Sequence, residues 1–191
     1  MTDPKKLVIR LAGDADGSAI ARLRRDWTQE QQAREPGPQQ PGIQEQGLQE
    51  HGGERAEPGF EQRLAAWYEQ ESSRRVFWLA EVDGVAAGMM NLTVFERMPR
   101  PGRPASRWGY LGNAFVLPEY RNQGIGKRLI RALLDHAARN DFARVVLSPS
   151  ERSISFYQRA GFGPADELMV RPGSYRREHG DEDIARLSTR R

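Results

Sequence analysis

Residues Asn113–Arg128 read NAFVLPEYRNQGIGKR, and this stretch carries the strongest structural signal in the chain. Its first half is an apolar strand that ends at Pro118, and its second half opens a long amphipathic helix, Arg121–Asn140. Gly124 and Gly126 stand where the turn becomes the helix. Glycines let a backbone come close to a ligand, and the first N–H groups of a helix have no partner within it. Because the positive end of the helix dipole lies there too, we predict a pyrophosphate site.

Two other phosphate-binding loops are excluded by the residues at fixed positions. A Walker loop places Ser or Thr after its Gly-Lys pair, whereas Arg128 follows Gly126 and Lys127 here. A Rossmann fingerprint needs a third glycine where Leu129 stands. The side chains of Arg121, Lys127 and Arg128 add positive charge for the remaining phosphate. From this segment alone, a glycine-rich helix start without a ligand stays the alternative.

The segments on either side of this stretch predict a mixed α/β domain. Runs typical of strands lie at Leu7–Leu11, Val76–Val82, Val85–Phe95, Trp108–Leu117, Ala143–Leu147 and Leu168–Val170. Helical periodicity marks Ala15–Gln32, Phe60–Ser72, Arg121–Asn140 and a segment that stops at Gly161. Antiparallel hairpins followed by strand-helix-strand crossovers give a mixed sheet with helices on both faces.

Three local signals refine these elements. Asp83-Gly84 predicts a tight hairpin turn between the second and third strands. The ARVVL run at Ala143–Leu147 is expected to form a central, buried strand. Ser148-Pro149-Ser150-Glu151 predicts a capping box at the start of the last helix, and Gly161 a left-handed residue at its end.

Two segments are expected to lie outside the packed domain. From about residue 31 to 59 the sequence is dominated by Gln, Pro, Gly and Glu, which predicts a mobile loop or insertion. Such a loop is either a spacer or a lid that becomes ordered when substrate binds. Residues 173–191 are charged and predict a flexible C-terminal tail. The domain itself is therefore assigned to residues 1–172.

The composition excludes several classes of protein. The chain has no cysteine, so disulfides and thiolate chemistry are excluded, and its three histidines lie far apart without metal-ligand spacing. We therefore expect no metal site. The net charge of +3 does not predict nucleic-acid binding. The N-terminal apolar run is too short for a signal peptide or a membrane span, so a cytoplasmic protein without membrane attachment is expected.

Two motifs in the right order resemble the GNAT superfamily of N-acetyltransferases. The family signature (Gln/Arg)-x-x-Gly-x-(Gly/Ala) is matched by Arg121, Gly124 and Gly126, directly after the strand end Val116–Tyr120. A second block, SERSISFYQRAGF at Ser150–Phe162, is similar to the family pattern N-x-x-(A/S)-x-x-(F/L)-Y-x-x-x-G-F. The resemblance covers roughly residues 5–171, with the Gln- and Pro-rich stretch as an insertion.

The resemblance implies a fold, a co-substrate and a set of binding residues. The fold is a GNAT-type central sheet, mixed but mostly antiparallel, of about six to seven strands with helices on both faces. The co-substrate is acetyl-CoA, with no metal. The strand backbone at Ala114, Phe115 and Val116 would pair with the pantetheine amides. The pyrophosphate would be held by Arg121 and by the backbone of Asn122, Gln123, Gly124, Ile125, Gly126 and Lys127. Ser150 stands where the family often has a coenzyme-contacting asparagine.

By the same resemblance, an amine attacks the thioester directly and Tyr157 donates a proton to the departing thiolate. The alternative for Tyr157 is ordinary helix packing beside Phe156. Family members that acetylate protein N-termini often have a glutamate base where this chain has the apolar Val145. The base is therefore left open between water and four carboxylates, which are Asp26, Glu30, Glu81 and Glu96.

The acceptor is expected to be the primary amine of a small molecule. Tyr110 and Asn113 flank the coenzyme strand and are expected to face the acceptor. The four tryptophans are expected mainly in the core. Acetylation of a protein lysine or N-terminus is the alternative within enzymes. A non-catalytic acyl-CoA-binding regulator is the alternative from another class. A homodimer remains open.

Overall fold

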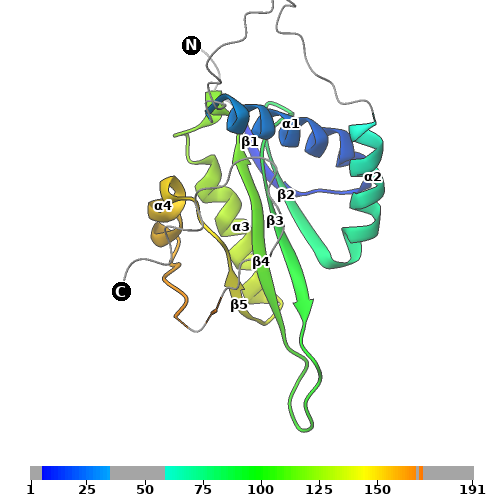
Figure 1. The fold of residues 1–191 in the computed structure, drawn as a ribbon, viewed down its shortest axis with the longest axis vertical. Helices are drawn as coiled ribbons and strands as arrows, with labels where there is room; N and C mark the ends of the chain where they lie inside the picture. Colours follow the sequence, from blue (N-terminus) through cyan, green and yellow to red (C-terminus); the bar gives the residue numbers. More distant parts are fainter. Residues whose placement is uncertain (1–5, 35–58, 167, 170–191) are drawn as a thin grey trace, which may run out of the picture. The chain divides into compact units, whose positions relative to one another are not determined.

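A five-stranded sheet runs through the described part of the chain, which in this computed structural model comprises residues 6–34, 59–166 and 168–169 (Figure 1). Its strands lie in sequence order: β1 (Leu7–Leu11), β2 (Arg75–Val82), β3 (Val85–Glu96), β4 (Arg107–Val116) and β5 (Phe142–Val146). The first four strands pair antiparallel, and β5 pairs parallel with β4. The predicted mixed, mostly antiparallel sheet is thus confirmed, with fewer strands than the six to seven expected.

The chain divides into two compact units, Met1–Ile154 and Ser155–Arg191, and each is described by itself. The helices are α1 (Gly17–Arg34), α2 (Phe60–Glu71), α3 (Ile125–Arg139) and α4 (Ile154–Arg159). Short 3-10 turns lie at Asp14–Asp16, Ser72–Arg74, Pro118–Tyr120 and Glu151–Ser153. The sheet, α1, α2 and α3 all belong to the first unit.

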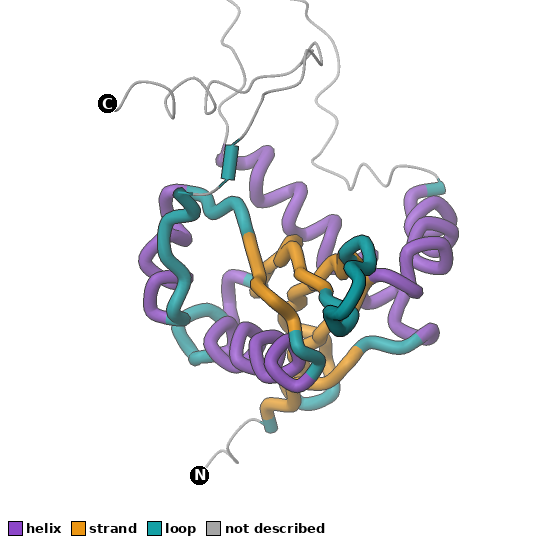
Figure 2. Tube along the Cα trace, turned by 90° about the horizontal axis from the view of Figure 1, so that it is seen from below, coloured by secondary structure: helices purple, strands orange, loops and turns teal. Residues whose placement is uncertain are grey.

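Side-chain alternation along β2 shows which helix covers which face of the sheet. Phe77 and Leu79 belong to the same buried cluster as Ile20 and Leu23 of α1, whereas Trp78 between them packs edge-on against His136 of α3. Successive strand residues point to opposite faces. The α1 face and the α3 face are therefore the two sides of the sheet, and Figure 2 shows strands with helices on either side.

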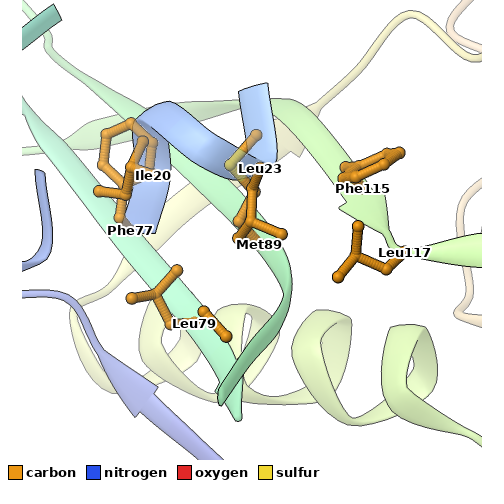
Figure 3. Close-up of a cluster of buried hydrophobic side chains, with 8 residues drawn as sticks. Ile20, Leu23, Phe77, Leu79, Met89, Phe115 and Leu117 are labelled. Carbon is orange, nitrogen blue, oxygen red and sulfur yellow. The ribbon is translucent and has the colours of Figure 1, made fainter. Parts of the chain in front are cut away.

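The core on the α1 face is built from one helix and three strands. Figure 3 shows Ile20 and Leu23 of α1 close to side chains of β2 and β3, with Phe115 and Leu117 completing the cluster. The other members are Phe77, Leu79, Ala86 and Met89. The helical spacing of the apolar residues in α1 thus fixes its docking on the sheet. This core holds the end of β4 in place just before the glycine-rich loop, residues 117–124, which connects β4 to α3.

Two irregularities in β4 shape the region of the predicted site. Met89 pairs with Phe115 and Asn91 pairs with Gly112, so β4 carries one extra residue, a β-bulge at Asn113 and Ala114. Asn113 has φ +48, in the left-handed region that asparagine tolerates better than most residues. On the opposite edge, the pairing of β4 with β5 ends at Tyr110 and Val146. The last part of β4 therefore extends beyond its parallel neighbour.

Of the predictions about turns and helix ends, the hairpin turn and the left-handed Gly161 are confirmed, and the capping box is wrong. The hairpin turn is confirmed, because Asp83 and Gly84 both have positive φ, +51 and +80, as a type I′ turn requires. Gly161 is left-handed as predicted, with φ +91. The capping box is wrong: the last helical segment begins after Ser150, which has extended backbone angles and makes no side-chain cap. Ser148 therefore lies before the cap position.

β5 is not the central strand that its apolar sequence predicted. It forms the edge of the sheet in the described residues and is partly exposed, with Ala143 and Arg144 facing solvent. The short pairing with β4 explains this, because only one edge of β5 is used and only over its length beside Arg107–Tyr110. Of the predicted strand at residues 168–170, the described residues 168 and 169 form no strand.

The predicted insertion begins later than the sequence indicated. Residues 31–34 belong to α1 and residue 60 opens α2, so only 35–58 could form an insertion, and these lie outside the described residues. The predicted tail at 173–191 lies outside them as well. The division of the chain into a 1–172 domain and a tail therefore stays a prediction.

An ion-pair network joins β1, β2 and the turn before α1. The Arg10 guanidinium donates to both carboxylate oxygens of Asp16, each at 2.7 Å, and to Glu81 Oε1 at 2.6 Å. The Gly13 N–H also donates to Asp16, at 2.7 Å. The hydrogen bonds from Arg10 lower the pKa of Asp16 to about 2. The charged form of Asp16 is therefore favoured by folding.

Asp16→Asn should lower the melting temperature at neutral pH by roughly 3–6 °C, since the charge-assisted bonds contribute about 1–2 kcal/mol at a partly exposed site. Because the folded pKa lies below the ordinary value of 3.8, this contribution is complete above about pH 4 and disappears as the pH falls toward about 2. Thermal melts of both proteins across that range test the sign. Asp14→Asn, an exposed neighbour in the same turn, is the control and should change little.

Candidate active site

The glycine-rich loop begins where β4 ends and stops where α3 starts. Pro118–Tyr120 forms a 3-10 turn in which the Tyr120 N–H donates to the Leu117 carbonyl at 2.9 Å. Asn122 and Gly124 then adopt positive φ, +61 and +79. These two left-handed residues explain why α3 begins at Ile125 rather than at Arg121, as the sequence had suggested.

The start of α3 presents backbone donors for an anion. Gly124 is the N-cap residue and supplies no side-chain cap, and the first helical bond runs from the Arg128 N–H to the Gly124 carbonyl at 3.1 Å. The N–H groups of the first helical turn therefore have no acceptor within the helix. Left-handed residues that precede a helix start can turn successive N–H groups toward one concave site. This geometry suits a pyrophosphate, as the glycine spacing predicted.

The end of β4 offers an extended backbone beside this loop. Phe115 and Val116 pair with Met89 and Gly88 of β3 on one edge. On the other edge, the described pairing with β5 stops at Tyr110, before Ala114 is reached. An extended ligand arm can hydrogen-bond such an edge as an additional strand. Ala114, Phe115 and Val116 thus lie where a pantetheine arm could run toward the loop.

Arg121 makes contacts that the sequence did not predict. Its Nε donates to the Val116 carbonyl at 2.9 Å, and its Nη1 donates to Glu30 Oε1 at 2.7 Å. Its Nη2 pairs with the second oxygen of Glu30, and the guanidinium lies 5.7 Å from the centre of the Phe115 ring. Arg121 therefore ties α1 to the end of β4. No sequence signal could indicate a pair that is 91 residues apart.

The four candidate base residues lie in different surroundings. Glu30 contacts the loop through Arg121, and Glu81 belongs to the Arg10 network. Glu96 lies 3.4 Å from Arg107 near the far end of the β3–β4 pair, and Asp26 lies in α1. Glu30 is therefore the candidate nearest to the loop by direct contact. The assignment of a base stays a prediction.

Ser150 and Tyr157 lie on either side of the boundary between the two units. Ser150 precedes the 3-10 turn at Glu151–Ser153, with its hydroxyl 3.0 Å from that of Ser153. Tyr157 is 8% exposed and packs edge-on against Phe156 and Phe162, with ring centres 5.0 and 5.8 Å away. These ring contacts agree with the packing alternative and leave the proposed role in proton transfer open.

Aromatic side chains gather on the α1 face of β3 and β4, away from the core. Phe95 stacks on Trp108 at 4.3 Å, and both Phe95 and Tyr110 are exposed. Cross-strand pairing places Trp108 opposite Phe95 and Tyr110 opposite Thr93, so these side chains share one face. Of the four tryptophans expected mainly in the core, Trp78 is buried there, whereas Trp27, Trp67 and Trp108 are only half-buried.

Two features are absent from the described residues. In the ranges that the structure covers, no three histidine or carboxylate side chains lie close enough to hold a metal ion. Over the same ranges, no helix combines the length and the apolar character needed to cross a membrane.

Comparison with known proteins gives one family. The model of the acetyltransferase (GNAT) family matches residues 43–162, more than half of the 191-residue chain. A glucosamine 6-phosphate N-acetyltransferase of Trypanosoma brucei brucei is 33% identical over 86 residues, which span 45% of this chain and 56% of that protein.

Solved structures show the same fold. A predicted acetyltransferase from Clostridium acetobutylicum, crystallised with acetyl-CoA, superposes with a TM-score of 0.62 at 18% identity, covering 87% of this chain and 96% of that one. A glucosamine-6-phosphate N-acetyltransferase from Arabidopsis thaliana superposes with a TM-score of 0.59 at 16% identity, covering 87% and 98%. At these identities the structures establish fold alone, and the match to the family model adds the sequence evidence. The chain belongs to the acetyltransferase (GNAT) family.

Proposed function

We propose that this acetyltransferase transfers the acetyl group of acetyl-CoA to the primary amine of a small molecule. The observation that carries the proposal is the adjacency of two surfaces: the edge of β4 beyond Tyr110 and the N–H groups at the start of α3. The first suits a linear chain with amides, and the second suits a pyrophosphate. Coenzyme A contains both parts in this order. The acetyl-CoA in the related Clostridium acetobutylicum structure supports the same co-substrate.

The proposed reaction is a direct acyl transfer. The neutral amine attacks the carbonyl carbon of the thioester, a C–N bond forms, and the C–S bond breaks as the tetrahedral intermediate collapses. The amine loses a proton to a base, for which Glu30, the other carboxylates and water stay candidates. The thiolate takes up a proton, and Tyr157 is proposed as its donor. Coenzyme A and the acetylated amine leave as products.

A small polar amine is favoured as acceptor. The relatives from Trypanosoma brucei brucei and Arabidopsis thaliana are named for glucosamine 6-phosphate, an amino sugar. Exposed aromatic side chains at Phe95 and Tyr110 offer flat apolar surfaces on the α1 face of the sheet. Sugar rings have apolar C–H faces that pack on such surfaces. We therefore place the acceptor on this face and an amino sugar first among the substrates to test.

Calorimetry with acetyl-CoA and a release assay for free coenzyme A thiol test the proposal together. We expect binding of acetyl-CoA and thiol release that depends on an added amine. The amines should include glucosamine, glucosamine 6-phosphate, cyclohexylamine and a lysine-containing peptide. Binding of acetyl-CoA without turnover of any amine would contradict the enzyme assignment and favour a regulator. Turnover of the peptide alone would contradict the small-molecule acceptor.

A further inference from the structure

Asn91 is a fully buried polar side chain whose hydrogen-bonding groups are not used. It lies in β3 and is 0% exposed. Neither its Nδ2 nor its Oδ1 has a hydrogen-bond partner among the described residues. Burying a carboxamide in this way is strongly unfavourable, and buried polar groups without partners are rare in native proteins. A role outside the fold itself is therefore the first explanation to examine.

The neighbouring polar residues show that this face of the sheet otherwise satisfies its polar groups. Thr93, two residues further along β3, accepts a hydrogen bond from Arg75 Nη1 at 2.6 Å. Arg75 in turn donates from Nε to Glu71 Oε2 at 2.6 Å, and Glu71 also pairs with Arg74. Each of these side chains has a partner within the protein. Asn91 differs from these neighbours, because neither of its polar side-chain atoms has a hydrogen-bond partner among the described residues.

The position of Asn91 connects the core to the exposed aromatic surface. It pairs with Gly112, the residue directly before the bulge at Asn113 and Ala114. A Cβ added to Gly112 would lie 3.6 Å from Asn91 Oδ1 and 3.7 Å from Tyr110 Cε1. The carboxamide and the Tyr110 ring therefore lie within van der Waals distance of the same point, the place of a side chain that Gly112 lacks. The pairing of Asn91 with Phe77 places it on the α1 face, the face assigned to the acceptor.

The Tyr110 ring beside Gly112 is itself partly in solvent. Tyr110 is 39% exposed, and exposed side chains change rotamer within nanoseconds. Because Gly112 contributes no Cβ, a turn of the Tyr110 ring would leave room above Asn91 for a small group. A carboxamide has both donor and acceptor atoms, and this combination matches a hydroxyl group, which both donates and accepts.

We propose that Asn91 is a specificity-determining residue of the acceptor site, where its carboxamide hydrogen-bonds a hydroxyl group of the amine substrate after Tyr110 turns aside. The substrate class is then a hydroxylated primary amine, such as an amino sugar. This inference rests on the proposed acetyltransferase function and adds the recognition of the acceptor. No bond of the substrate is made or broken by Asn91.

Asn91→Leu tests the proposal with two probes, glucosamine and cyclohexylamine, which are six-membered-ring amines with and without hydroxyl groups. The variant keeps the branching at Cγ and removes both polar atoms. We expect kcat/KM for glucosamine to fall roughly tenfold, as for loss of one hydrogen bond, while kcat/KM for cyclohexylamine stays within about twofold. The melting temperature should stay the same or rise, because the variant no longer buries a carboxamide without a partner.

Thr93→Val is the matched control, since it removes a hydroxyl that does have a partner inside the protein. It should lower the melting temperature and leave the ratio of the two kcat/KM values unchanged. Asn91→Val serves as a second, smaller apolar variant if the leucine does not fit. An Asn91 variant that melts lower and weakens both probes equally would assign Asn91 to the fold and overturn the proposal.

The wild-type protein separates failure of this inference from failure of the proposed function. If it does not bind acetyl-CoA, the proposed function fails. If it binds acetyl-CoA and acetylates cyclohexylamine in preference to glucosamine, the inference about hydroxyl recognition is wrong, whereas binding of acetyl-CoA without turnover of any amine counts against the proposed function. Preference for glucosamine that is lost in both Asn91 variants supports it.

Discussion

Gly126→Glu should weaken the binding of acetyl-CoA at least about 100-fold without unfolding the protein. Gly126 lies in the first turn of α3 and is not among the glycines with positive φ, so a side chain there causes no backbone strain. A glutamate near a helix N-terminus is favourable for the helix itself. The same carboxylate would lie where the pyrophosphate is proposed to bind. Like charges about 4 Å apart repel by roughly 4 kcal/mol at a protein surface, which exceeds the 100-fold loss expected.

Gly126→Gln separates charge from size, because it has nearly the same volume and no charge. We expect a smaller loss of affinity for the glutamine variant, and a melting temperature close to that of the wild type for both. Calorimetry gives the Kd values, and thermal melts show that the variants are folded. Gly124 is unsuitable for this experiment, since its φ of +79 would strain any other residue. A folded glutamate variant with wild-type affinity would show that the coenzyme binds elsewhere.

The features that the sequence predicted well are those set by neighbouring residues. The hairpin at Asp83 and Gly84 needs positive φ at two adjacent positions, and these residue types are the ones that adopt it easily. The resemblance to one family also rested on two short motifs, at Arg121–Gly126 and Ser150–Phe162, and the match to the family model confirms it.

The features that the sequence missed depend on residues far apart in the chain. The ARVVL segment looked like a buried strand, but burial depends on what lies beside and above it, and β5 has only β4 as a described neighbour. The pairing of Arg121 with Glu30 arises because α1 docks across the end of β4. Asn91 and Thr93 are the polar residues in the otherwise apolar run MMNLTVF, and a carboxamide in such a run was a usable signal.

The binding residues differ in how far the structure supports them. For Gly124, Phe115 and Val116, the backbone geometry suits the predicted contacts with the coenzyme. Arg121 has the predicted place in the loop, but its guanidinium pairs with Glu30 in this structure. Its assignment to the phosphate is therefore the least direct of the set. These contacts, like the role of Ser150, stay predictions.

Tyr157→Phe should lower kcat by about 10²–10⁴-fold, the usual effect of removing a general acid. The ring contacts of Tyr157 with Phe156 and Phe162 do not involve its hydroxyl, and phenylalanine keeps them. We therefore expect the melting temperature to fall by no more than about 4 °C, and the Kd for acetyl-CoA to stay within about twofold. The measurement is kcat at saturating acetyl-CoA with an amine that the wild type acetylates.

Tyr68→Phe is the matched control for the loss of a tyrosine hydroxyl. Tyr68 packs on Phe77, and its hydroxyl lies 3.5 Å from the Gly13 carbonyl, in the turn before α1. Its removal should leave kcat within about twofold of the wild type. A loss of turnover confined to Tyr157→Phe, with folding and coenzyme affinity preserved, would leave proton donation as the function of that hydroxyl. If kcat of Tyr157→Phe instead stays within about threefold of the wild type, Tyr157 is a packing residue, and water or another side chain protonates the departing thiolate.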